Sequence, residues 1–189
     1  MTPIKVLIAL FASSFLPLCA ASLKDLTYTT TNGKVTITDC DGAAKGKLVI
    51  PDTIDGKPVT SIGGFAFYEN SLTSITIPDS VTRISGQAFR SCSSLTSITI
   101  PNGVTSIESI AFYNCKSLAS IMIPDSVTSI GDEAFHNCTS LKNITIPDSV
   151  TSIGKHAFSK CTKLTNITFQ GPAPTVDADA FKDVADDAI

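Results

Sequence analysis

The chain has 189 residues, of which 43% are apolar and 16% charged, and its formal charge is −3. This composition is typical of one folded, β-rich domain with a sizeable core, and it argues against disorder. Because the chain has no excess of Lys and Arg to neutralise phosphates, nucleic acid and anionic membranes are poor candidates as its main partners.

The first residues, 1–21, have the pattern of a secretory signal peptide. A lysine precedes the apolar run 6–18, and small residues follow. The run is shorter than the about 20 residues of a membrane-spanning helix. We expect cleavage after Ala20 or Ala21; lipidation of Cys19 is the less favoured alternative. The sequence therefore predicts a secreted or cell-surface protein, periplasmic or on the outer surface if bacterial, with no transmembrane segment.

Residues 22–58 are expected to form an N-terminal cap. Alternating apolar and polar runs flank Asn32-Gly33, which is a strong pattern for a β-hairpin. Leu48-Val-Ile-Pro51 then resembles the end of a strand in the repeats that follow.

From Val59 onward the sequence repeats, with a period of 23 residues and a first copy that is one residue short. We expect five repeats over 59–170, then a half-repeat and tail over 171–189. An Ala-Phe pair marks each copy. The phenylalanines in this register are Phe67, Phe89, Phe112, Phe135, Phe158 and Phe181.

Each copy contains two short extended segments and a turn. Residues 95–100 alternate apolar and hydroxyl side chains up to Pro101, which predicts a strand with one buried face. Residues 104–107 predict a second short strand, and residues 108–116 a turn or a single helical turn. Because such a unit cannot bury its apolar face alone, the copies are expected to stack into a β-rich solenoid with parallel strands.

The repeat pattern resembles a known family. Ala134-Phe135, Cys138, Leu141 and the residues up to Gly154 follow the pattern of the BspA-like leucine-rich repeats, and the resemblance covers about residues 42–184. It implies a leucine-rich-repeat solenoid on secreted or surface-exposed proteins, associated with adhesion and protein binding. Met122 in a strand and Gln170 in place of a strand-ending proline depart from the pattern.

Every repeat except the first carries one cysteine in the same register, which invites a metal or disulfide hypothesis. We favour buried free thiols, because cysteine is a small and commonly buried residue and Val184 occupies the same register in the last copy. A disulfide between rungs stays open, and metal binding is disfavoured by the spacing. The repeated cysteines are Cys92, Cys115, Cys138 and Cys161.

No catalytic motif is recognisable, so we expect a non-enzymatic protein with no cofactor, no bound metal and no catalytic residue. The two histidines, His136 and His156, stand in different registers and are expected to be exposed loop residues. Asn137, Asn143 and Asn166 stand in the sequence pattern of glycosylation acceptors. The pattern has no meaning in a bacterium; in a secreted eukaryotic protein Asn143 and Asn166 could carry sugar.

The candidate binding surface is the outward side of the predicted strands. It is neutral and rich in hydroxyl groups, and five strands give it an area of about 480 Å². A stable protein interface needs about 800 Å² per partner. We therefore expect weak or multivalent binding to a host, envelope or identical protein, aided by loop residues such as Tyr68 and Tyr113. The strand residues are Ser74, Thr76, Ser97, Thr99, Ser120, Met122, Asn143, Thr145, Asn166 and Thr168.

Two other functions stay open. The chain can be a structural or accessory repeat module, or a fragment of a longer array, with no ligand of its own. A carbohydrate or ice binder that uses a ladder of threonine hydroxyls is less favoured, because Met122 interrupts the threonine column.

Overall fold

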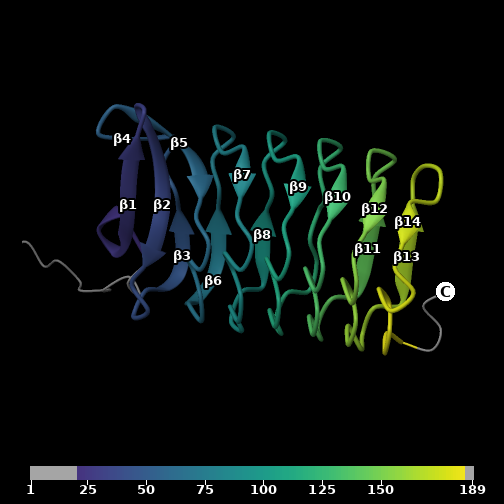
Figure 1. The fold of residues 1–189 in the computed structure, drawn as a ribbon. Coiled ribbons are helices and arrows are strands. Elements are labelled where there is room, and N and C mark those ends of the chain that lie inside the picture. The colour runs from purple at the N-terminus through teal and green to yellow at the C-terminus, as the bar shows by residue number, and fades with distance from the viewer. Residues whose placement is uncertain (1–20, 186–189) are drawn as a thin grey trace, which may run out of the picture.

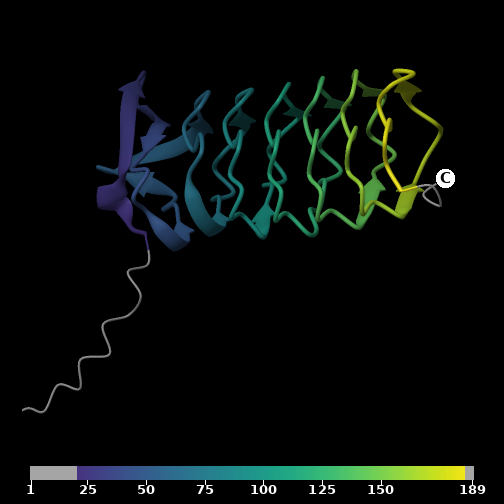
Figure 2. The same cartoon turned by 90° about the horizontal axis from the view of Figure 1, so that it is seen from below.

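The computed structural model describes residues 21–185. The predicted signal peptide lies outside this range except for Ala21. The chain winds into stacked rungs, each about one sequence repeat long, and the rungs follow one another in order along one axis (Figures 1 and 2). The predicted solenoid of parallel strands with a 23-residue period is confirmed.

A hairpin lies at the N-terminal end of the stack (Figure 1). β1 and β2 pair antiparallel around Asn32 and Gly33, whose φ angles of 51° and 70° are positive as a type I′ turn requires. β2 then pairs in parallel with β5, the first strand of the regular stack on this side. The elements of this end are the 3₁₀ turn η1 (Leu23–Asp25) and the strands β1 (Leu26–Thr31), β2 (Lys34–Cys40), β4 (Thr53–Ile54), β5 (Lys57–Ile62) and β7 (Arg83–Ile84).

One side of the stack carries the longer strands, but their pairing is interrupted. β3, β6 and β8 form a three-stranded parallel sheet, and β11 and β13 form a separate pair. The predicted strand in residues 118–123 is wrong: this rung keeps only an isolated bridge between Met122 and Thr99. The strands are β3 (Lys45–Val49), β6 (Ser71–Thr76), β8 (Ser97–Thr99), β11 (Asn143–Ile146) and β13 (Asn166–Phe169).

Two substitutions explain the interruption. Thr96 and Thr99 of one rung are replaced by Ala119 and Met122 in the next. Alanine and methionine favour extended backbone less than the β-branched threonine. The Thr96 hydroxyl also donates to the carbonyl of Thr73, at 2.9 Å, and Ala119 has no hydroxyl with which to repeat that bond.

The second side of the stack continues from β5 and β7 with shorter strands, and its pairing is also interrupted once, between β7 and β9. Four two-residue strands pair in parallel, so the predicted second extended segment is confirmed. Glycine follows two of them, and the turn of the preceding rung packs closely there: a Cβ on Gly131 would lie 2.7 Å from the backbone nitrogen of Ser109. The strands are β9 (Ser106–Ile107), β10 (Ser129–Ile130), β12 (Ser152–Ile153) and β14 (Thr175–Val176).

The turn segment of each rung, residues 108–116 and their equivalents, joins the two sides. It is built of four-residue turns, so of the two predicted alternatives, a turn or a single helical turn, the turn is confirmed. Its amides donate forward along the stack, for example Phe89 N to Ala111 O at 2.9 Å, whereas strand amides donate backward, for example Thr96 N to Thr73 O at 2.9 Å. Neighbouring rungs are therefore tied together in both directions.

Phenylalanine rings fill the core beside the turn segments. Five of them are fully buried, and successive rings are parallel with centroids 5.1–5.3 Å apart. The last ring, Phe181, is half-buried. The stacked phenylalanine column predicted from the repeat is confirmed. Its rings belong to Phe67, Phe89, Phe112, Phe135, Phe158 and Phe181.

Candidate functional site

We call the outward side of the longer strands, with residues 118–123, the strand face. Leucine and isoleucine point inward in each rung, and the residues between them are exposed. All ten candidate binding residues lie on this face. Nine are exposed and Ser74 is half-buried. Strand register places Ser74 beside Ser97 and Thr76 beside Thr99, and at the other end Asn143 beside Asn166 and Thr145 beside Thr168.

The strand face extends one rung further than the repeats indicate. β3 pairs in register with β6, which places Lys47 beside Ser74 and Val49 beside Thr76. Val49 is 67% exposed. The resemblance of residues 48–51 to the end of a repeat strand was the only signal for this addition, because β3 belongs to no full repeat.

A groove of about 470 Å³ lies where the strand pairing is interrupted. Met122, which is 78% exposed, lies on its wall. β11 is paired only with β13 among the described strands, so its other edge faces this groove. A long backbone hydrogen bond crosses the interruption, from Lys142 N to Ala119 O at 3.4 Å. The groove is lined by Asn102, Ser120, Ile121, Met122, Ile123, Pro124, Asp125, Asn143, Thr145 and Gln170.

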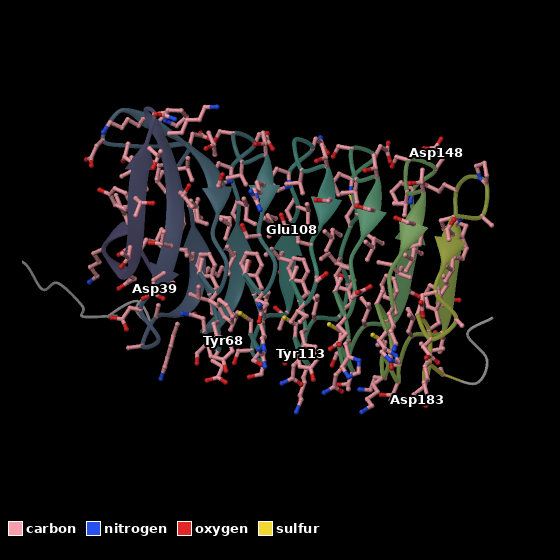
Figure 3. The ribbon with its side chains drawn as sticks, viewed as in Figure 1. Asp39, Tyr68, Glu108, Tyr113, Asp148 and Asp183 are labelled. Atoms are coloured by element: carbon pink, nitrogen blue, oxygen red, sulfur yellow. The ribbon has the colours of Figure 1, made fainter. Side chains whose placement is uncertain are left out.

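A column of polar and aromatic side chains follows the turn segments. The Arg90 guanidinium lies between two tyrosine rings, 5.7 Å from the centroids of Tyr68 and Tyr113. Tyr113 stacks on His136 with centroids 5.0 Å apart, and His156 meets His136 edge-on at 6.4 Å. Figure 3 shows Tyr68 and Tyr113 along one edge of the stack. We call these five residues the ring column.

The expectation that both histidines are exposed and unrelated was wrong. His136 and His156 are both half-buried and lie in contact. His136 follows Phe135 in one rung and His156 precedes Ala157 in the next, and these two positions meet where the rungs stack. Burial lowers the pKa of His136 below the usual value for histidine. Sequence spacing alone did not show this contact, since the two registers differ.

The repeated cysteines are buried free thiols, as predicted. Each donates to the carbonyl of a phenylalanine in the preceding rung; Cys92 Sγ, for example, lies 2.8 Å from Phe67 O and Cys138 Sγ lies 3.2 Å from Phe112 O. Burial raises the pKa of Cys138 well above its ordinary value, so its thiol is neutral and a poor nucleophile.

In most rungs the cysteine position supplies a hydrogen-bond donor in addition to the volume inferred from Val184. In the rung without a cysteine this position holds Asn70, which is buried and donates from Nδ2 to Asp41 O at 3.0 Å. Its Oδ1 accepts from Leu72 N at 3.0 Å. Asparagine thus satisfies the backbone where the thiol is missing.

Two observations bear on other kinds of site. Within residues 21–185, no three His, Cys, Asp or Glu side chains are grouped closely enough to hold a metal ion. In the same part of the chain, no helix has the length and hydrophobicity needed to cross a membrane.

Comparisons with known proteins identify the repeat type. The family model of the BspA type leucine rich repeat region matches residues 60–186, in six copies. No curated protein matches the chain.

Several solved structures are similar to this one. A leucine rich repeat protein of T. pallidum is 36% identical with a TM-score of 0.73; the match covers 79% of this chain and 71% of that one. A leucine-rich repeat protein of Bacteroides ovatus is also 36% identical, with a TM-score of 0.68, and the match covers 76% of this chain and 39% of that one. A leucine rich cell surface protein of Faecalibacterium prausnitzii is 27% identical with a TM-score of 0.53, over 85% of this chain and 57% of that one. The chain therefore belongs to the BspA-type leucine-rich repeat proteins.

Proposed function

We propose that this chain is a non-enzymatic protein of the cell surface or extracellular space that binds another protein through its strand face. The observation that carries the proposal is the composition of that face. Five consecutive rungs expose neutral hydroxyl and amide groups there, and the β3 rung adds Lys47. Two apolar side chains of the face, Val49 and Met122, are strongly exposed. Apolar side chains among polar ones are typical of the centre of a protein interface.

The size of the strand face argues for weak binding by one molecule. Six rungs about 4.8 Å apart and about 20 Å wide give an area near 580 Å². This is below the about 800 Å² per partner of a stable interface, and the face has no Trp, Tyr or Arg anchor. We therefore propose that binding gains strength when several copies act together, with the ring column as an added contact.

The extracellular location is supported by two observations. Residues 1–21 have the composition of a signal peptide. The F. prausnitzii protein that resembles this chain is described as a cell surface protein. The proposed organisation is a signal peptide over 1–21, a cap over 22–58, repeats over 59–170, and a half-repeat with a tail over 171–189.

The test compares two triple variants in the same rungs. Thr99→Glu, Met122→Glu and Thr145→Glu place three charges on the strand face. The control, Thr105→Glu, Thr128→Glu and Thr151→Glu, places three charges on exposed threonines of the second side. Wild-type protein and both variants are biotinylated, presented as monomers or as streptavidin tetramers, and measured against extracellular host and envelope protein fractions.

We expect the tetramer to bind at least tenfold more tightly than the monomer, and the strand-face variant to lose binding that the control retains. Nanomolar binding by the monomer, or equal binding by both variants, would contradict the proposal. A structural repeat module without a ligand is the second candidate, supported by the match to only 39% of the longer B. ovatus protein. Absence of binding by the tetramer would favour it.

A further inference from the structure

We propose that the groove beside Met122 binds a neutral saccharide, by recognition of its hydroxyl groups. The groove shares Ser120, Met122, Asn143 and Thr145 with the strand face. The proposal does not depend on the protein binding proposed above, because it rests on the lining of the groove alone. Its volume of about 470 Å³ lies within the about 300–1,000 Å³ of small-molecule pockets.

The polar groups that line the groove match a polyhydroxylated ligand. Three amide side chains and two hydroxyls can each both donate and accept, as sugar hydroxyls do, and the Asp125 carboxylate can accept two hydroxyl protons. The hydrogen bond from Asn166 Nδ2 to Asn143 Oδ1, at 2.7 Å, involves only the oxygen of the Asn143 amide. The Nδ2 group of Asn143 can therefore still donate to a ligand. The exposed thioether chain of Met122 supplies an apolar surface for the C–H side of a sugar ring.

Charge argues against an ionic ligand. The lining contains no Lys, Arg or His, so an anionic ligand would meet Asp125 without a compensating cation. A cationic peptide would pair with a single exposed carboxylate, which stabilises a complex by only about 0–1 kcal/mol. The cationic group itself would leave the amide donors of Asn102 and Gln170 unmatched, because an ammonium or guanidinium group has no acceptor. The hydroxyl groups of a neutral saccharide can donate to the Asp125 carboxylate and also accept from the amides of Asn102 and Gln170.

The groove cannot accept an added peptide strand. Insertion of a strand would require the flanking rungs to separate by a further about 4.8 Å. The same two rungs are held together elsewhere by the stack of Phe112 on Phe135, with centroids 5.3 Å apart, and by the pairing of Ser106 with Ser129. The unpaired edge of β11 is therefore open to a small ligand and closed to a strand.

Methyl NMR gives a direct test, because the chain contains only two methionines, Met1 and Met122. Full-length protein labelled with [methyl-¹³C]methionine is titrated with cellotriose, maltotriose and chitotriose, each up to about 10 mM. A Met122→Leu variant assigns the signal. We expect at least one trisaccharide to shift the Met122 methyl resonance with a saturating curve.

A matched pair of variants locates the binding. Asp125 and Asp79 occupy the same register two rungs apart, both are exposed, and only Asp125 lines the groove. Asp125→Ala should weaken binding about tenfold, and Asp79→Ala should leave it unchanged. The methyl spectrum of the unliganded variants verifies that both are folded.

Three results would overturn the proposal: no shift with any of the three sugars, equal losses in the two variants, or a shift with trilysine and not with a sugar. None of them depends on the streptavidin-tetramer assay. Failure of the saccharide site can therefore be distinguished from failure of the proposed protein binding.

Discussion

The strand face and the phenylalanine column repeat with the same period, yet only one of them is interrupted. The rings stack from Phe67 to Phe181 with nearly constant spacing, whereas the strand pairing stops at residues 118–123. A buried ring stabilises its neighbours on both sides, and any gap would leave a cavity. An exposed threonine supports the rung mainly by β propensity and one hydrogen bond, so its replacement leaves the stack intact.

The largest effect is expected from breaking the phenylalanine column at its centre. Phe135→Ala should lower the free energy of unfolding by about 3–5 kcal/mol, because Phe135 is fully buried between two rings. Phe181→Ala should cost much less, since Phe181 is half-buried and its only ring partner among the described residues is Phe158. Denaturant melts measure both, and equal losses would contradict a stack that weakens toward this end.

Close packing on the second side is tested by Gly131→Ala. The added Cβ would lie 2.7 Å from Ser109 N, which forces the rungs apart, so we expect a loss of about 1–3 kcal/mol. Gly42→Ala is the control, because a Cβ there has nothing within 4 Å. Similar melting curves for the two variants would show that the close approach is not required.

Substitutions should be able to remove the interruption of the strand pairing at residues 118–123, or to create a second one in the preceding rung. Ala119→Thr with Met122→Thr should restore a paired strand and raise the free energy of unfolding by about 1 kcal/mol. Thr96→Ala with Thr99→Met should create a second interruption and lower it by a similar amount. Amide hydrogen exchange in β11 should slow in the first variant; unchanged exchange would refute the role given to these two positions.

A smaller effect is expected at the cysteine position. Cys138→Val keeps most of the volume but removes the thiol that donates to Phe112 O, so we expect a loss below about 1 kcal/mol. Phe112 O also accepts from Cys115 N at 3.3 Å and is not left unpaired. A collapse of the fold in urea melts would instead indicate that the thiols have a bonding role.

The smallest effect is a pH dependence from the ring column. Burial lowers the pKa of His136 in the folded protein, so the unfolded chain binds a proton at this residue more readily than the folded protein does. The contribution of neutral His136 to folding stability is therefore complete at pH values above the pKa of histidine in the unfolded chain, about 6.5. That contribution is lost as pH falls toward the folded pKa. Urea midpoints should therefore fall between pH 7.5 and pH 5 by more in wild type than in His136→Gln; parallel curves would show that His136 does not contribute.

The sequence by itself determined the period, the inward residues and most of the strand face. Side chains alternate along a strand, so residues 95–100 already showed that Ser97 and Thr99 point outward while Ile98 is buried. The phenylalanine column followed from identity at a fixed spacing, because stacking of equal units brings equivalent residues together. The hairpin followed from the local conformational preference of Asn32-Gly33.

Only the tertiary structure decided what happens between neighbouring rungs. Met122 looked like a single departure within a strand, yet together with Ala119 it ends the strand pairing and opens a groove. Ile110 adopts a φ of 63°, which a β-branched residue rarely adopts, because the turn segment takes a positive φ at this position in five successive rungs. The contact of His136 with His156 likewise depends on how one rung lies on the next. Local patterns describe one rung, whereas these features arise from contacts between residues about 20 positions apart.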